Sequence, residues 1–75
     1  MISKSEEKAV LAFYERVRSL LDEGYVSVFS ALDEPLFFAK LRHENGNYVC
    51  VILNIHERKL SQLKNGKEVF SSKVC

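Results

Sequence analysis

Proline, glycine and cysteine are scarce in this chain of 75 residues, which has one proline, three glycines and two cysteines. Few chain breakers together with 47% hydrophobic residues argue against a disordered or low-complexity protein. Two cysteines are too few for a disulfide framework. Cys50 lies in an apolar run, where a buried reduced thiol is expected, and Cys75 is the last residue. We therefore expect no Cys50–Cys75 bridge.

Long apolar runs are also missing, and none approaches the roughly 20 residues that a membrane span requires. The first residues include Glu6 and Glu7, where a secretory leader would need basic residues and then an apolar core. We expect no membrane segment and a cytoplasmic location. At this length we expect one domain, residues 1–75, whose core buries only about 60% of the unfolded surface.

The net charge of +1 is small, but the charges are unevenly distributed. Residues 1–34 carry four basic and seven acidic side chains, whereas residues 35–75 carry seven basic and three acidic ones. This asymmetry favours a helix and a sheet with complementary charged surfaces. By itself it predicts neither a nucleic-acid partner nor a membrane partner.

Motifs that carry chemistry are absent: the chain contains no GxxxxGK[ST], GxGxxG, HExxH or GxSxG. His43 and His56 would lie about 26 Å apart along the expected sheet, so with Cys50 they form no shared metal site. Cys50 and His43 are within side-chain reach, yet no carboxylate stands beside either to orient a catalytic base. We predict no metal, no cofactor and no enzymatic activity.

The first expected element is an amphipathic helix over residues 5–23. Its apolar positions recur with helical spacing: Val10, Phe13, Tyr14, Val17, Leu20 and Leu21. Ser3 or Ser5 is a suitable N-cap, and Gly24 is placed to end the helix in the left-handed conformation.

Strands are expected over residues 25–32, 36–43, 48–56, 58–63 and 68–73, because β-branched and aromatic residues are enriched there between turn signals. The turns contain Pro35 and two Asn-Gly pairs, Asn45-Gly46 and Asn65-Gly66. In the last third a rival interpretation makes residues 55–65 a short helix capped by Asn54. We favour the hairpin.

The register of the central hairpin follows if Asn45-Gly46 is a two-residue loop, which places Leu41 opposite Cys50. One face of this hairpin would then carry Phe37, Ala39, Leu41, His43, Tyr48, Cys50 and Ile52. The other would carry Leu36, Phe38, Lys40, Arg42, Val49, Val51, Leu53 and Ile55. Both faces are largely apolar, and one helix can cover only one of them.

These patterns predict an α+β fold, with an N-terminal amphipathic helix packed on one face of an antiparallel β-meander of four to five strands. The uncovered face predicts a small non-catalytic protein–protein interaction module, unless the sheet coils enough to hide its own second face. Its partner would be a second copy in a homodimer, or a larger protein to which it docks as an accessory subunit or inhibitor. Phages and mobile elements encode accessory proteins and inhibitors of this size. The expected contact residues are Phe38, Val49, Val51 and Leu53, with Lys40 and Arg42 at the rim.

The alternative is a domain that binds single-stranded nucleic acid through the same face. Lys40 and Arg42 alternate with Phe38, a mixture that can hold phosphates and stack a base, and Arg58 and Lys59 could extend it. The basic residues are scattered and the total charge is near neutral, which places this interpretation second.

Overall fold

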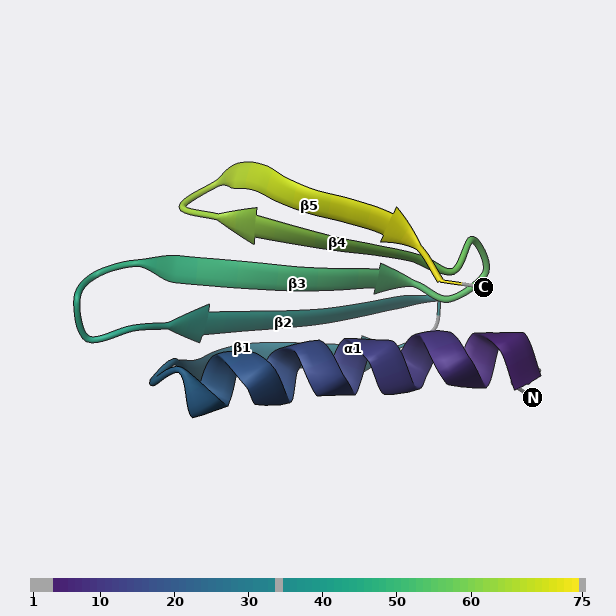
Figure 1. Cartoon of the computed structure of the whole chain (residues 1–75), viewed down its shortest axis with the longest axis horizontal. Coiled ribbons are helices and arrows are strands. Elements are labelled where there is room, and N and C mark those ends of the chain that lie inside the picture. Colours follow the sequence, from purple (N-terminus) through teal and green to yellow (C-terminus); the bar gives the residue numbers. More distant parts are fainter. Residues whose placement is uncertain (1–3, 34, 75) are drawn as a thin grey trace.

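The computed structural model describes residues 4–33 and 35–74 and confirms the α+β prediction. One helix is followed by five antiparallel strands in the spatial order β1-β2-β3-β4-β5, so each strand pairs with its neighbours in sequence. The helix lies against one face of this meander (Figure 1). The elements are α1 (Lys4–Asp22), β1 (Val26–Asp33), β2 (Leu36–Arg42), β3 (Tyr48–Asn54), β4 (Lys59–Lys64) and β5 (Lys67–Lys73), each within two residues of its predicted ends.

Helix α1 ends as the sequence predicts. Gly24 has φ +103°, its N–H donates to the carbonyl of Leu21 at 3.1 Å, and the N–H of Tyr25 donates to that of Leu20 at 3.1 Å. This bond pair is the Schellman arrangement, which glycine adopts without a Cβ clash. At the other end, the N-cap expected at Ser3 lies outside the described residues, and Ser5 lies within the helix. No helix in the described part of the chain is long and apolar enough to cross a membrane.

The last third forms the predicted hairpin, so the rival helix over residues 55–65 is wrong. The Asn54 side chain does accept a hydrogen bond from the N–H of Glu57 at 3.1 Å, as a helix cap would. The chain nevertheless turns back, with Arg58 at φ 53°, and continues as β4. Asn65 and Gly66 both have positive φ, 51° and 84°, as a two-residue type I′ loop requires.

The predicted register of the β2–β3 hairpin is wrong by one residue. Leu41 pairs with Val49 rather than with Cys50. The N–H of His43 donates to the carbonyl of Asn47 at 2.8 Å, and between these two residues only Gly46 has positive φ, +96°. The connection is therefore a three-residue loop with glycine in the left-handed position, not a two-residue loop.

This one-residue shift decides which side chains form the core. It places Phe37, Ala39 and Leu41 of β2 on the same face as Val49, Val51 and Leu53 of β3, and all six are buried. Val49, Val51 and Leu53 were predicted to share an open contact face with Phe38. That placement is wrong, because these three side chains lie beneath α1, at most 1% exposed.

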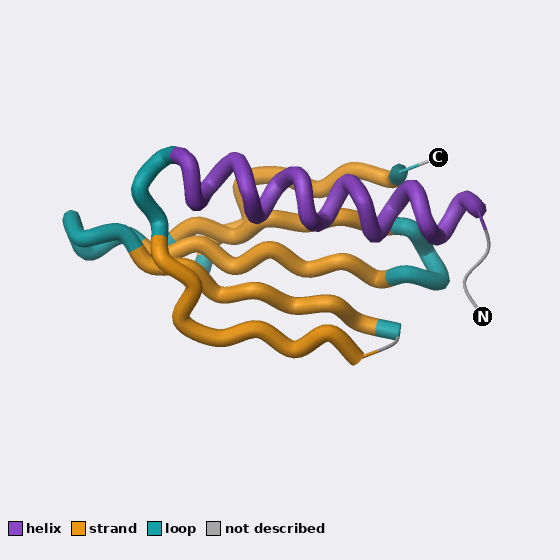
Figure 2. Tube along the Cα trace, turned by 90° about the horizontal axis from the view of Figure 1, so that it is seen from below, coloured by secondary structure: helices purple, strands orange, loops and turns teal. Residues whose placement is uncertain are grey.

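The core lies between α1 and the middle of the sheet. Its helix residues are Ala9, Phe13 and Leu20, and its sheet side is completed by Ile55 and Leu60. The Phe13 ring meets that of Phe37 edge-on at 5.7 Å. The helix packs mainly on β3 and β4. β1 lies at one margin of the sheet (Figure 2), and all of its residues except Ala31 are exposed. The side of β1 that faces the helix layer is therefore uncovered.

Candidate interaction surface

The outer face, defined as the sheet face opposite α1, is set by the alternation of each strand. Burial alternates in step with it along β2 and β3, where the outer residues are exposed or half-buried. The outer face carries Val26, Phe29, Ala31 and Asp33 of β1, Leu36, Phe38, Lys40 and Arg42 of β2, Tyr48, Cys50, Ile52 and Asn54 of β3, and Lys59, Ser61 and Leu63 of β4.

An apolar band runs across the centre of the outer face. Phe29 and Leu36 are about half exposed, at 56% and 49%. The rings of Phe29 and Phe38 lie 6.0 Å apart, so β1 and β2 present a paired aromatic surface. Ile52 and Leu63 extend the band onto β3 and β4 as half-buried side chains. No element of the described chain packs over this band (Figure 1).

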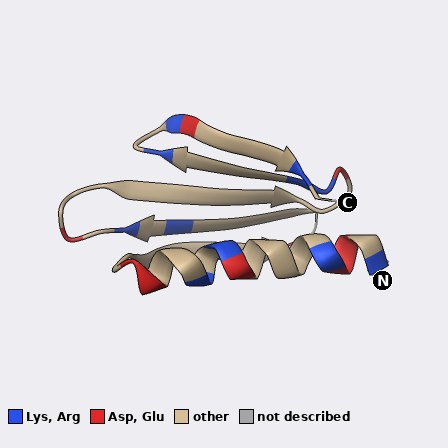
Figure 3. Cartoon of the chain, in the orientation of Figure 1, with Lys and Arg blue, Asp and Glu red and all other residues tan. Residues whose placement is uncertain are grey.

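A basic and aromatic group lies beside the band, toward the β2–β3 hairpin. The ammonium of Lys40 lies 5.2 Å from the centre of the Tyr48 ring, a cation–π arrangement. Lys40, Arg42 and Tyr48, together with Val28 and Gly46, line a depression of about 310 Å³. Figure 3 shows the basic residues of β2 gathered at this end of the strand. The outer face thus combines an apolar centre with a basic rim.

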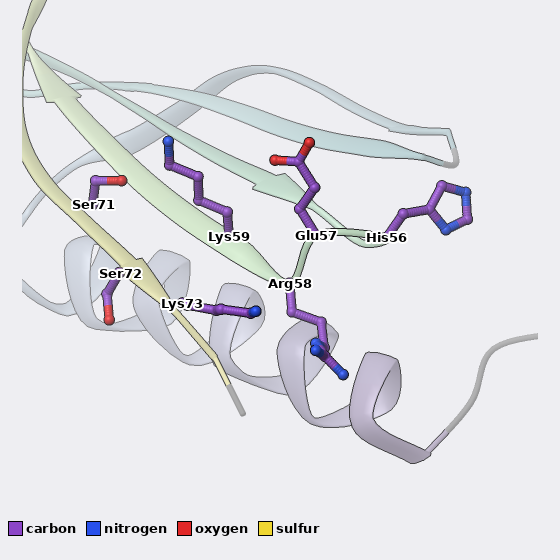
Figure 4. A pocket seen from close by; sticks show the side chains of 7 residues that line it. All are labelled: His56, Glu57, Arg58, Lys59, Ser71, Ser72 and Lys73. Carbon is purple, nitrogen blue, oxygen red and sulfur yellow. The ribbon is translucent and has the colours of Figure 1, made fainter.

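A second depression, of about 520 Å³, lies at the other end of the sheet and is lined by His56, Glu57, Arg58, Lys59, Ser71, Ser72 and Lys73. Its side chains diverge (Figure 4): Lys59 and Glu57 point away from the helix, whereas Arg58 points toward it. The Arg58 Nη1 donates to Ser5 Oγ at 3.3 Å. Because its cations do not converge, this depression does not resemble an anion site.

The residues weighed for chemistry are spread over the molecule. Cys50 is a free, half-buried cysteine on the outer face, and Cys75 lies outside the described residues. The His43 ring packs on Tyr25 at 5.1 Å and lies beside Gly24, just after α1, whereas Cys50 is on the outer face. His56 Nδ1 lies 3.2 Å from Glu6 in the first turn of α1. Among the described residues, no three His, Cys, Asp or Glu side chains are grouped to hold a metal.

The predicted surface residues divide into two groups. Phe38, Lys40, Arg42 and Lys59 lie on the outer face. Arg58 points toward the helix instead, and Val49, Val51 and Leu53 are core residues. The register prediction missed Ile52, which shares the outer face with Phe38 as its direct cross-strand partner.

The contribution of β1 to this surface was also missed. The strand was predicted, but its position at the sheet margin, with Phe29 beside Phe38, depends on long-range pairing that a local pattern does not encode. Comparison of the chain with protein-family models, with curated proteins and with solved structures found no match.

Proposed function

We propose that this chain is a small non-catalytic protein–protein interaction module that docks through its outer face, as an accessory subunit or inhibitor of another protein or as a partner of itself. The observation that carries the proposal is the apolar band of Phe29, Leu36, Phe38 and Ile52, which nothing in the described chain covers. Contiguous apolar surface of this kind is unfavourable in water and commonly marks a binding site.

The composition of the outer face supports protein association. Its aromatic centre resembles the buried middle of an interface, and Lys40 and Arg42 stand where a polar rim is expected. Aromatic anchors near the middle of an interface supply most of its binding free energy. Phe38 is therefore the first residue to change.

The test compares Phe38→Lys with the matched control Leu11→Lys, which adds the same charge at a 59% exposed position on α1. The native chain, immobilised on beads, should retain a specific protein from a lysate of the cell that produces it. Phe38→Lys should abolish retention and Leu11→Lys should preserve it. Equal retention by the native chain and by Phe38→Lys would contradict the proposal, provided that circular dichroism shows both variants folded.

A dye measurement tests the surface without a known partner. Anilinonaphthalene sulfonate fluoresces on exposed apolar surface. The folded native chain should enhance its fluorescence, and Ile52→Lys should reduce that enhancement more than Leu11→Lys does. An unchanged signal in Ile52→Lys would show that the outer face is not an accessible apolar surface.

A second candidate, single-stranded nucleic-acid binding, is favoured by one observation. Lys40, Arg42, Tyr48 and Phe38 lie on one face, so phosphate contacts and base stacking are geometrically compatible there. Labelled single-stranded RNA and DNA should bind more weakly as salt rises, and Arg42→Ala should weaken binding where the control Lys67→Ala does not. Absence of binding at low salt would eliminate this candidate.

A further inference from the structure

The two margins of the sheet differ in how they are protected against pairing with another chain. Sheet edges expose rows of N–H and C=O groups, and proteins usually guard them with charges, bulges or covering elements. The β5 margin carries Lys67, Glu68 and Lys73, and the Arg16 guanidinium lies 5.5 Å from the centre of its Phe70 ring. Charges and a helix side chain therefore guard β5.

The β1 margin lacks such charges. Its sequence, VSVFSALD, contains no charged residue before Asp33 and no proline. It is apolar toward both sides of the sheet: Val28 and Phe29 are 58% and 56% exposed, and Leu32, on the helix side, is 47% exposed. One bulge, at Val28, interrupts its pairing with β2, and the stretch from Phe29 to Asp33 is regular. This five-residue stretch contains no bulge, no proline and no charge before Asp33.

We propose that β1 pairs antiparallel with β1 of a second copy of this chain, which joins two five-stranded sheets into one continuous sheet. The inference names the partner of the interaction module and rests on that proposed function. A β1–β1 contact is related by a twofold axis and closes, so it produces a dimer and no further growth. Pairing of β1 with β5 of the next copy would instead form open filaments, and the charges of β5 oppose it.

The charges along β1 and β2 complement each other in this arrangement. Asp33 lies at one end of β1, and Arg42 and Lys40 of β2 lie beside the other end, where they pair with Val26 and Phe29. If Ala31, the midpoint of the regular stretch, lies on the twofold axis, Asp33 of one copy is opposite Phe29 of the other. Because Phe29 pairs with Lys40 within its own copy, Asp33 and Lys40 then lie in the same row across the joined sheet. The two Asp33 residues are then about 13 Å apart, so their mutual repulsion is screened.

The position of α1 is compatible with such a dimer. Antiparallel pairing places both helices on the same face of the joined sheet. Each helix packs mainly on β3 and β4 of its own copy, and the helix-side residues Ser27, Ser30 and Leu32 of β1 are exposed, so neither helix covers the joined edge. The outer-face side chains of both copies remain accessible, and a further partner can still bind to the apolar band.

The first test measures mass by size-exclusion chromatography with light scattering over a dilution series starting at about 100 µM, a range suited to the micromolar affinity expected of a small interface. The native chain should show twice its mass of 8.6 kDa, falling on dilution. Val28→Asp should weaken the dimer at least about tenfold, because it places a second carboxylate next to Asp33 of the other copy at the paired edge.

Val69→Asp is the matched control, because Val69 is 56% exposed and is the unpaired residue at the bulge of the other edge strand. It should leave dimerisation unchanged. A monomer at every concentration, or equal weakening by both substitutions, would overturn the proposal. If the native chain is monomeric yet still captures a partner through Phe38, the proposed function stands and the self-pairing does not.

A cross-link tests the register even if Val28→Asp fails to fold. In a Cys50→Ser, Cys75→Ser background, Ala31→Cys should form a disulfide-linked dimer under mild oxidation, because directly opposed strand residues have Cα atoms about 4.5–5.5 Å apart. Ser71→Cys, exposed on β5, is the control and should stay monomeric. Cross-linking of Ser71→Cys but not of Ala31→Cys would overturn the β1 pairing.

Discussion

The two faces of β3 should respond very differently to truncation, and neighbouring residues allow a direct comparison. Leu53 is fully buried beneath α1, whereas Ile52 is half-buried on the outer face. Truncating a fully buried leucine costs about 2–5 kcal/mol, from lost burial and from the cavity that remains. At about 0.05–0.15 kcal/mol per residue, the whole chain has only about 4–11 kcal/mol of unfolding free energy. Leu53→Ala should therefore remove a large part of it.

The measurement is urea unfolding followed by far-ultraviolet circular dichroism, because the chain has no tryptophan. For an m-value of about 1 kcal/mol per molar, a loss of about 3 kcal/mol lowers the unfolding midpoint by about 3 M. Ile52→Ala, which removes less buried surface, should lower it by about 1 M or less. Repeating the titration at a tenth of the protein concentration separates any effect on dimerisation from an effect on folding.

The reasoning is refuted if the two substitutions lower the unfolding free energy equally, or if Ile52→Ala lowers it more. If Ile52→Ala destabilised the chain as much as Leu53→Ala, the helix would not cover the face assigned to it. The outer face would then be internal, and both the interaction module and the β1 dimer would lose their basis.

Three further predictions concern turns and one buried polar contact, all measured by urea unfolding. Gly24→Ala should lower the unfolding free energy more than Gly46→Ala. Both glycines have positive φ, but a Cβ at Gly24 would lie 3.0 Å from a histidine ring atom, whereas a Cβ at Gly46 would meet open space. Arg16→Met should cost about 1–3 kcal/mol, since the buried side chain of Gln62 accepts a hydrogen bond from Arg16 Nε, and adding Gln62→Leu should recover most of that loss. Asn65→Gly should cost less than Asn65→Ala, because glycine tolerates φ 51° although both lose the bond to the N–H of β3.

The elements were predictable from the sequence because their signals are local. The stripe that includes Phe13 and Leu20 marks the helix, and Gly24 ends it with the expected hydrogen bonds. Asn65-Gly66 likewise forms the loop that its residues favour. At each of these positions the information lies within a few residues of the structure it specifies.

The register of the central hairpin was not predicted because two signals conflict there. Asn45-Gly46 locally favours a two-residue loop, which would place Lys40 opposite Val51. A three-residue loop instead places Lys40 opposite Cys50 and Ala39 opposite Val51, so apolar residues face α1 and charged residues face water. Burial outweighs the turn preference, because a one-residue slip moves every side chain of a strand to the other face. The sequence did contain a signal for the correct register. Only that register places Lys40 and Arg42 on the opposite face from the three buried residues of β3.

The surface is predictable in kind but not in its residues. One helix leaves one sheet face open in either register, so an apolar open face follows from the element count alone. Which β3 side chains occupy that face follows only from the register. The open edge at β1 can be recognised only from the strand order, because a strand lies at a margin when no other strand pairs with its second side.

Width explains why this chain would associate. A helix is about 10–12 Å across with its side chains, whereas the axes of the two outer strands of a five-stranded sheet, at about 4.8 Å spacing, are about 19 Å apart. A single helix therefore covers little more than half of one face: the helix-side residues of β2 and β3 are buried, whereas those of β1 and β5 are exposed. The chain could enclose β1 only by adding a second helix, which would require roughly 20 more residues with their ordering entropy. A second copy, paired as proposed, would supply edge hydrogen bonds to β1 without lengthening the chain.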